Sequence, residues 1–399
     1  MKVAFIGDRL GLATGGNLYV SRVAEELAAL GVEVTLITLV PPRDISWSSN
    51  LRIISETVDF SFGQRPAKDR IKTFFHSRWA AVTQLKKLVR EPYDILYSVG
   101  GPSNIVNLLC QRGPFPPRVS VAALFHLFRQ VPYHHFLVKA ETYQKPFQTL
   151  YHSLGDHLAK RFFVITVSEF WRKKLIDRGF LQEKIKVIPV GADWENWPSI
   201  PPEEAKKELE VSGRFVIYTS PFRLNKGILT VLQAIDLLKK EFPALMVLAT
   251  GVTDHQTQHQ VRQFVREHHL ENHFRYAGLV QREELPFYYF AADVVALVSL
   301  EEEGWGITLL EGMLSGKPVI GSPKGALTEL VQGRGLLLKK NTAQDLAQAI
   351  GQLIQSPELR DRLGQAGPPY ARQFSYPTAA LAHLSLFEEL LGCFANSKG

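Results

Sequence analysis

The stretch that decides the fold is EEEGWGITLLEGMLSGKPVIG, residues 301–321. It follows the apolar run DVVALVS (293–299) and continues into KPVIGS (317–322), so two predicted strands flank a helix that opens beside Gly304 and Gly306. Continuous Val, Ile, Leu and Ala runs in strand–helix–strand order are typical of a parallel sheet with helices on both faces. The segment therefore predicts one βαβ unit of an open α/β sheet.

The same alternation extends in both directions and predicts two such sheets. The 399 residues suffice for two domains of about 200 residues each. The proline- and tryptophan-containing segment 193–202 is the predicted linker, and the tail 343–391 reads as consecutive helices. Helices are expected over 17–30, over 227–241, near 256–268, near 283–291 and from about 306; the remaining strands are expected at 1–7, 32–39, 94–100, 120–126, 162–168, 185–191, 214–220, 244–251 and 274–278.

The glycine turn before the deciding helix has the features of an anion site. Glycine lets a backbone approach a ligand closely, and the first N–H groups of a helix have no partner within the helix. The amides of Gly306, Ile307 and Thr308 are therefore candidate donors to an anionic ligand.

Two carboxylates lie eight positions apart around this turn, Glu303 and Glu311. Glu311 falls only ~40° from Ile307 on a helical wheel, on a predicted apolar stripe with Leu310 and Leu314. A buried carboxylate is costly unless something donates hydrogen bonds to it, and vicinal ribose hydroxyls of a nucleotide would do so. The alternative is structural: a buried arginine meets Glu311, and the acidic run 301–303 favours the helix N-terminus. We prefer the functional interpretation for Glu303 and Glu311, and the structural one for Glu301 and Glu302.

The net charge of +7 is unevenly distributed. Residues 1–195 carry 26 basic and 17 acidic side chains, whereas the remainder is slightly acidic. Between Arg65 and Arg90 eight basic residues accompany one acid, with Phe74, Phe75 and Trp79 interleaved. This pattern fits an anionic membrane surface, nucleic acid or a phosphorylated acceptor, or else an ordinary solvated helix face.

Nothing in the sequence indicates a signal peptide or a long apolar run that would span a bilayer, so we expect a cytoplasmic protein. The two cysteines, Cys110 and Cys393, cannot form a disulfide framework or a cysteine-rich zinc site. No Asp-x-Asp motif or histidine cluster is present, and we expect neither a metal nor another cofactor.

The segment EGWGITLLEGMLSGKPVI resembles the E-x7-E segment of retaining GT-B glycosyltransferases in family 4. Further stretches match that family in order and cover nearly the whole chain: the loop at Gly15 and Gly16, AALFH, FFVITVSE, KIKVIPVGAD and HFRYAGLVQREELPFYYFAADVVALVS. The resemblance implies two Rossmann-like domains facing across a cleft. They would be an acceptor-binding domain over 1–195, joined by a C-terminal helix at 376–395, and a donor-binding domain over 196–375.

The resemblance also implies residue roles. Glu303 would hold hydroxyls of the donor sugar and Glu311 the nucleotide ribose. Arg223 and Lys226 would bind the diphosphate, stabilising charge that grows as the glycosidic bond breaks. The family usually separates these cations by four residues, and here only two intervene, so Arg223 is alternatively a surface turn residue.

Other matched positions would line the site. Gly15 and Gly16 would approach the donor phosphate, His126 would lie near the transferred sugar, and the backbones of Gly251 and Val280 would line the nucleotide pocket. A histidine that ends a strand is also compatible with a purely structural role.

The implied activity is a metal-independent hexosyltransferase that uses a nucleoside-diphosphate sugar and retains anomeric configuration. UDP would be the commonest nucleotide in the family, and the acceptor would be a sugar, a lipid or another small molecule rather than nucleic acid. A sugar-nucleotide epimerase, a phosphorylase or a non-catalytic binding protein on the same fold are the alternatives. A nicotinamide dehydrogenase fits poorly because GDRLGLATGG (7–16) does not match G-x-G-x-x-G.

Overall fold

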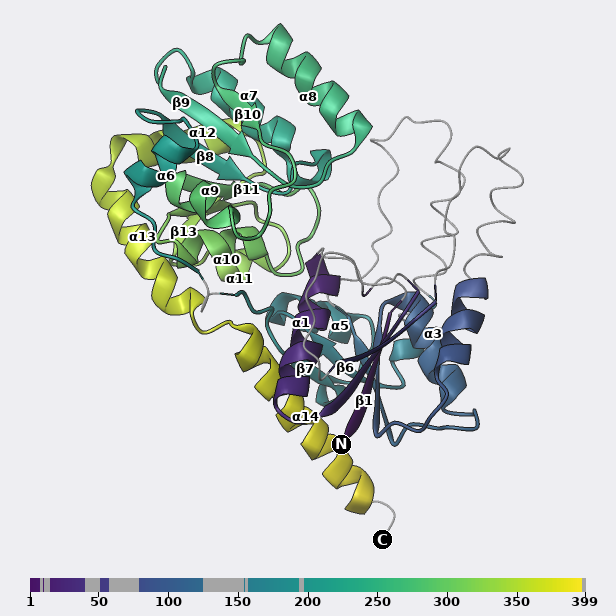
Figure 1. The fold of residues 1–399 in the computed structure, drawn as a ribbon. Coiled ribbons are helices and arrows are strands. Elements are labelled where there is room, and N and C mark those ends of the chain that lie inside the picture. Colours follow the sequence, from purple (N-terminus) through teal and green to yellow (C-terminus); the bar gives the residue numbers. More distant parts are fainter. Residues whose placement is uncertain are drawn as a thin grey trace, which may run out of the picture. The chain divides into compact units, whose positions relative to one another are not determined.

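The computed structural model describes residues 1–7, 10, 15–39, 51–56, 79–124, 154, 157–193 and 197–396. It contains two compact units (Figure 1): an N-terminal unit, Met1–Gly191 with Tyr376–Gly399, and a C-terminal unit, Ala192–Ser375. Each unit is built on one parallel sheet with helices packed against it, and this confirms the predicted α/β fold of two Rossmann-like domains.

The sheet of the N-terminal unit has the strand order β3-β2-β1-β4-β5-β6-β7. Its parallel register places Lys2 beside Glu33 and Val3 beside Ile95. Helix α1 (Gly15–Ala29), helix α3 (Gly101–Cys110), helix α5 (Glu169–Asp177) and a helical segment at 79–88 accompany it. The strands are β1 (Lys2–Gly7), β2 (Glu33–Thr38), β3 (Leu51–Ser55), β4 (Ile95–Val99), β5 (Val119–Ala123), β6 (Phe163–Thr166) and β7 (Ile185–Val187).

The sheet of the C-terminal unit has the order β10-β9-β8-β11-β12-β13 and is parallel throughout. Its strands are β8 (Phe215–Thr219), β9 (Leu245–Ala249), β10 (Phe274–Tyr276), β11 (Val294–Leu297), β12 (Val319–Gly321) and β13 (Gly335–Leu337). Its helices are α6 (Pro202–Glu208), α7 (Ile228–Leu238), α8 (His255–Glu267), α9 (Leu285–Ala291), α10 (Ile307–Leu314), α11 (Leu327–Leu330), α12 (Ala343–Gln355) and α13 (Pro357–Ala371).

Strand order reverses beside β1 in the first sheet and beside β8 in the second. In each sheet the chain first adds strands on one side of that strand and then continues on its other side, with β4 and β11 respectively. Loops that leave the carboxyl ends of the two strands at such a point diverge, and open α/β sheets bind ligands in the crevice between them.

Helix α10 differs from the predicted amphipathic helix. Leu310 and Leu314 are buried as expected, but so are all the other residues of α10 except the half-buried Ile307, so the expected one-sided stripe that includes Ile307 is wrong. The reason is that α13 covers the face opposite the sheet. A Cβ on Gly367 of α13 would lie 3.0 Å from the Met313 Cα, so glycine is what lets the two helices pack this closely.

Helix α14 (Tyr376–Asn396) returns the chain to the N-terminal unit, where it packs along α1 (Figure 1). The chain crosses between the units at residues 191–192 and 375–376, and the Ala192 amide donates to the Phe374 carbonyl at 3.0 Å. Contrary to the expectation from sequence, one helix among the described residues is long and apolar enough to cross a membrane, Tyr376–Ala395. Core helices of soluble proteins share this length and composition.

A buried histidine fastens α14 to the sheet. The His383 Nδ1–H donates to the Ala379 carbonyl at 2.7 Å, which leaves Nε2 to accept from the Tyr97 hydroxyl at 3.3 Å. The Tyr97 ring packs edge-on against Phe387 of the same helix. Burial lowers the pKa of His383 from 6.5 to about 4, because a charged imidazole would have to leave water.

This histidine predicts an acid-sensitive helix. The unfolded chain binds a proton at His383 below about pH 6.5 and the folded chain only near pH 4, so stability is lost as pH falls through that interval. Between pH 7 and 4.5, His383 should lower the free energy of unfolding of the wild type by about 2–3 kcal/mol. His383→Phe should not show this part of the decrease. Urea unfolding at both pH values measures this.

His259→Phe, which changes an exposed histidine of α8, is the matched control and should keep the wild-type pH dependence. Equal pH dependence in wild type and His383→Phe would contradict the assignment.

Candidate functional site

Three loops meet at the carboxyl edge of the C-terminal sheet, and we call them the carboxyl-edge loops. They follow the adjacent strands β8, β11 and β12 and span residues 220–227, 298–306 and 322–326. The Leu300 amide donates to the Asn225 carbonyl at 2.9 Å, and the Ser322 hydroxyl donates to the Ser299 carbonyl at 3.0 Å. Each loop is thus hydrogen-bonded to its neighbour, and the first two lie on either side of the strand-order reversal.

An ion pair joins the first two carboxyl-edge loops. The Lys226 ammonium lies 2.6 Å from Glu303 Oε1, with the two side chains 24% and 11% exposed. Gly227, in the left-handed region, brings the loops together: a Cβ there would lie 2.2 Å from the Val298 carbonyl oxygen. Two residues selected from sequence, Lys226 and Glu303, therefore meet in the structure.

The backbone of Glu303 is held from its other side by the third loop. Gly325 has φ +60°, and a Cβ there would lie 2.3 Å from the Glu303 carbonyl oxygen and 2.4 Å from its nitrogen. The Ala326 amide donates to the same carbonyl at 3.1 Å. Any side chain at Gly325 would therefore displace Glu303.

The other two acids of the run have roles that the sequence analysis did not foresee. The Glu301 carboxylate accepts from the Asn225 side-chain amide at 3.0 Å, and Glu302 accepts from the Gly325 amide. Helix α10 begins later, with no acid in its first turn. The expectation that Glu301 and Glu302 favour the helix N-terminus is therefore wrong. Their carboxylates instead hydrogen-bond the loop 298–306 to its two neighbouring loops.

The N-terminus of α10 opens at the same edge. Gly306 caps the helix in the left-handed region at φ +105°, and none of the side chains that the structure describes caps it. The Thr308 hydroxyl is used elsewhere, donating to the Ser220 carbonyl at 2.9 Å. Uncapped N–H groups and the helix dipole together favour an anion here.

The carboxylate of Glu311 is buried, as predicted, but the protein itself supplies its donors. The Tyr289 hydroxyl donates to Oε2 at 2.6 Å and Arg282 Nη1 to Oε1 at 3.3 Å. Burial raises the pKa of Glu311, and Arg282 and Tyr289 oppose that rise. The structural alternative, in which an arginine meets Glu311, is therefore found in the structure: a half-buried arginine and a buried tyrosine provide hydrogen bonds, and the contact of Glu311 with ribose stays a prediction.

Residues around Glu311 tie it to the segment that enters the unit. Arg282 Nε lies 4.0 Å from the Asp193 carboxylate, and the Trp197 indole N–H donates to the Ser315 hydroxyl at 2.8 Å. Tyr289 packs against Trp197 with ring centroids 5.5 Å apart. The sequence analysis gave no role to Arg282, Tyr289 or Trp197. Tyr289 and Arg282 lie in a segment already noted for its resemblance, which was the available signal.

The remaining predicted residues of this unit lie at or near the same edge. Gly251 follows β9 with φ +101°, and its amide donates to the Gly278 carbonyl at 2.8 Å. Val280 is half-buried in the loop after β10. Arg223 is exposed, and its side chain makes no hydrogen bond or ion pair with the residues that the structure describes. Its part in phosphate binding stays a prediction.

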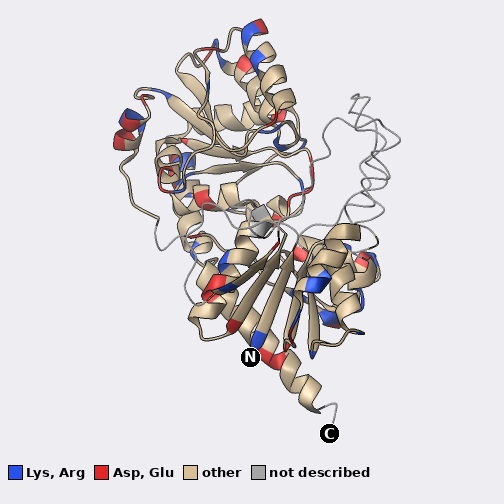
Figure 2. Ribbon diagram, turned by 45° about the vertical axis from the view of Figure 1, so that its right-hand side comes forward, with Lys and Arg blue, Asp and Glu red and all other residues tan. Residues whose placement is uncertain are grey.

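In the N-terminal unit, Gly15 and Gly16 form the first turn of α1, downstream of the carboxyl end of β1. His126 lies outside the described residues, as do Arg65, Lys68, Arg70, Lys72 and Arg78 of the basic region. Figure 2 shows basic and acidic residues interspersed along the described ribbon of both units.

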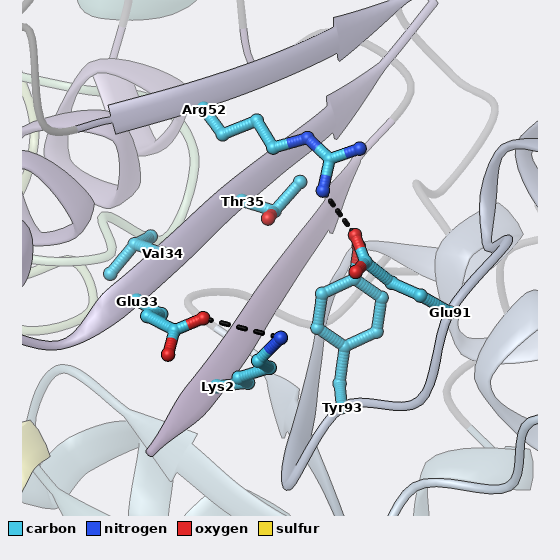
Figure 3. Close-up of a pocket in the computed structure, with 7 residues that line it drawn as sticks. All are labelled: Lys2, Glu33, Val34, Thr35, Arg52, Glu91 and Tyr93. Carbon is cyan, nitrogen blue, oxygen red and sulfur yellow. Dashed lines mark hydrogen bonds and ion pairs between the residues drawn. The ribbon is translucent and has the colours of Figure 1, made fainter.

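A small cavity at the amino edge of the N-terminal sheet has the character of structural ion pairing (Figure 3). Lys2 pairs with Glu33 at 3.3 Å, and Arg52 pairs with Glu91. Burial raises the pKa of Tyr93 to about 12. Its charged groups already neutralise one another, so the carboxyl-edge loops remain the candidate site.

Two family models match the chain, one for each unit. The model described as "Glycosyl transferase 4-like domain" matches residues 14–191, and the one described as "Glycosyl transferases group 1" matches residues 200–369. The chain is a GT-B protein similar to glycosyltransferase family 4.

Its curated relatives carry glycosyltransferase names. A D-inositol 3-phosphate glycosyltransferase of Corynebacterium jeikeium is 30% identical over 218 residues, 52% of each chain. An O-antigen chain mannosyltransferase B of Escherichia coli is 28% identical over 60% of this chain and 63% of its own. These alignments thus span between about half and two thirds of those relatives. A D-inositol 3-phosphate glycosyltransferase of Corynebacterium aurimucosum aligns over 93% of this chain and 90% of its own, at 25% identity.

Solved structures share the fold over the whole chain. A sucrose-phosphate synthase from Thermosynechococcus elongatus superposes with a TM-score of 0.75 at 22% identity, covering 98% of this chain and 99% of its own. HepE of Anabaena, solved in complex with UDP and glucose, gives a TM-score of 0.75 at 20% identity over 97% and 99%. At these identities the likeness concerns the GT-B fold.

The contact beneath Glu303 predicts an unusually costly glycine substitution. Gly325→Ala should lower the free energy of unfolding of the C-terminal unit by about 3 kcal/mol or more, because its Cβ would meet the backbone of Glu303. Gly333→Ala is the control: its φ is +75°, but a Cβ there meets nothing within 4 Å. Its free energy of unfolding should fall by only about 1–2 kcal/mol, the cost of placing alanine in the left-handed region. Chemical denaturation compares them, and equal losses would refute the steric role of Gly325.

Proposed function

We propose that the chain is a hexosyltransferase that moves a sugar from a nucleoside-diphosphate sugar to an acceptor, with retention of anomeric configuration and without a metal ion. The observation that carries the proposal is the Lys226–Glu303 ion pair, 2.6 Å long, between two loops at a strand-order reversal and beside the uncapped N-terminus of α10. A cation and a helix N-terminus suit a diphosphate, and a carboxylate suits sugar hydroxyls.

The ion pair suggests how donor binding and chemistry are linked. Without donor, Lys226 and Glu303 neutralise each other. An arriving diphosphate attracts Lys226 and so frees the Glu303 carboxylate for hydroxyls of the sugar. Lys226 then stabilises the negative charge that develops on the leaving diphosphate as the glycosidic bond breaks.

In the retaining reaction that we propose, the acceptor attacks from the face that the diphosphate leaves. A departing phosphate oxygen takes the acceptor proton, so no side chain needs to become a covalent nucleophile. Arg223, being exposed, is free to reach the diphosphate as a second cation. From the resemblance, His126 would lie near the transferred sugar, and Gly15 and Gly16 would approach the phosphate.

For Glu311 the proposal is a shared carboxylate. Tyr289 and Arg282 use one lone pair on each oxygen, and an ionised carboxylate offers about four acceptor positions in all. Ribose hydroxyls would occupy a remaining position, and the arginine and tyrosine would keep the group oriented. The backbones of Gly251 and Val280 would line the pocket for the base.

UDP is the nucleotide that we favour. It is the ligand named for the HepE structures, one of which holds UDP-glucose, and those structures share this fold. Metal independence is tested in the sugar-transfer assay described below: transferase activity should survive the addition of EDTA.

The acceptor is expected to be anionic or membrane-borne. Residues 1–195 carry nine more basic than acidic side chains, and two relatives are named for inositol 3-phosphate. Cytoplasmic location, with docking at an anionic membrane surface, is part of the same proposal.

A screen of UDP, GDP and ADP with their sugars tests the function. A ligand that binds only the folded state raises the melting temperature, and that shift identifies the nucleotide. Transfer to an acceptor such as inositol 3-phosphate, analysed for anomeric configuration, then supports the proposal. Isomerised donor without transfer would instead indicate an epimerase, cleavage by phosphate a phosphorylase, and binding without turnover a non-catalytic protein.

The linked roles of Lys226 and Glu303 predict opposite effects of two substitutions. Lys226→Ala should weaken UDP binding by roughly tenfold or more, because a charge-assisted contact to the diphosphate is lost. Glu303→Gln should bind UDP at least as tightly as wild type, since its lysine is unpaired, yet its transfer rate should fall roughly a hundredfold.

Calorimetric UDP binding and single-turnover transfer separate the two effects. Lys324→Ala, which removes a half-exposed lysine of the neighbouring loop, is the control for general charge loss. Weaker UDP binding by Glu303→Gln would overturn the proposed exchange of partners.

A further inference from the structure

A second cavity lies in the N-terminal unit, between the end of the helical segment 79–88 and the turn that follows α3. Its volume is about 510 Å³. The cationic residues that line it are Lys86, Lys87 and Arg90, and its apolar lining includes Val89, Cys110 and Phe115. We call it the amino-edge pocket.

The amino-edge pocket lies at the end of the sheet where the strands begin, opposite the carboxyl ends. Helix α3 starts just after the carboxyl end of β4 and runs back to Cys110, before β5 begins at Val119. The Asp94 amide, just ahead of β4, donates to the Lys2 carbonyl at the start of β1. The cavity therefore belongs to the edge at which the strands begin, away from the carboxyl ends where the transfer chemistry is proposed.

The charge around this pocket has one sign. Lys86, Lys87 and Arg90 are exposed, and none makes an ion pair with another residue that the structure describes. Glu91, the nearest acid in sequence, is paired with Arg52 on the other side. Three cations at one opening, without an acidic partner among the described residues, favour an anion, and they contrast with the balanced pairs of the cavity in Figure 3.

The rim of the amino-edge pocket is cationic, whereas its walls are apolar. The inner face of the helical segment, with Val82, Leu85 and Leu88, is buried in the core, whereas its outer face carries the cations. Phe115 remains 38% exposed, and Trp79, on the outer face of the same segment, is 61% exposed. Aromatic side chains beside lysine and arginine are typical of surfaces that meet the boundary between lipid head groups and acyl chains.

We propose that the amino-edge pocket binds an anionic amphiphile: a phosphate-bearing lipid whose head group meets Lys86, Lys87 and Arg90 and whose chain lies along Val89, Cys110 and Phe115. Free phosphate would use the rim but not the apolar wall. A neutral lipid would use the wall and leave the cations unmatched. The inference does not depend on the proposed sugar transfer, because it concerns the other edge of the sheet.

Calorimetric titration of the full-length protein with monomeric dihexanoyl phosphatidic acid tests the proposal. Wild type should bind it, and should bind inorganic phosphate and dihexanoyl phosphatidylcholine at least tenfold more weakly. Neutralising the rim with Lys86→Gln, Lys87→Gln and Arg90→Gln together should weaken binding roughly a hundredfold at low salt, because each cation near an anionic lipid contributes substantially.

Two further variants separate the pocket from general charge. Phe115→Ser removes an exposed part of the wall and should weaken phosphatidic acid binding severalfold without affecting phosphate. The triple control of Lys173→Gln, Lys174→Gln and Arg178→Gln removes equal charge from α5 and its C-cap, where all three residues are exposed, and should bind as wild type does.

Three results would overturn the proposal. They are no binding of phosphatidic acid to wild type, equal losses in the rim and control triples, and equal affinity for phosphatidic acid and inorganic phosphate. The last would mean a simple anion site.

Discussion

One close backbone contact underlies the candidate site: Gly325 lies directly against the peptide of Glu303. The carboxylate of Glu303 can meet Lys226 only because its loop is fixed between two neighbours, by Gly227 on one side and Gly325 on the other. The ion pair itself adds little to stability, since partly exposed pairs contribute about 0–1 kcal/mol. Its importance lies in position: it places opposite charges at the edge of the sheet where strand order reverses.

The charge of Glu311 is costly to bury, and the protein stabilises it with hydrogen bonds. Its side chain is buried, and an unpaired carboxylate there would cost several kcal/mol. Tyr289 and Arg282 make the group tolerable, and Arg282 also approaches Asp193 in the segment that enters the unit. The same carboxylate thus belongs both to the architecture of α10 and to the proposed nucleotide site. A residue with two roles cannot be assigned from its position on a helical wheel.

Much of the fold could be predicted from the sequence because parallel strands are buried on both faces and read as unbroken apolar runs. VVAL in β11 and LMVLA in β9 are examples. Strand β3, of which only Leu51 is buried, and β13, only three residues long, lack that signal and were missed. Within the site, Lys226 and Glu303 were predicted, but the partners of Glu311 were not. Tyr289 and Arg282 come from a different helix and loop, and such tertiary contacts leave no local pattern. The burial of α10 was misjudged for the same reason, since α13 covers it from about 50 residues further along the chain.

The return of α14 to the first unit has a consequence for synthesis on the ribosome. Tyr97 lies 286 residues ahead of His383, so Tyr97 and α1 are made long before His383 and Phe387, which cover them. The N-terminal unit therefore keeps an apolar surface open until α14 has been made, while the C-terminal unit, continuous from Ala192 to Ser375, has all its strands sooner. Of the two units, the one whose strands are made first is completed second.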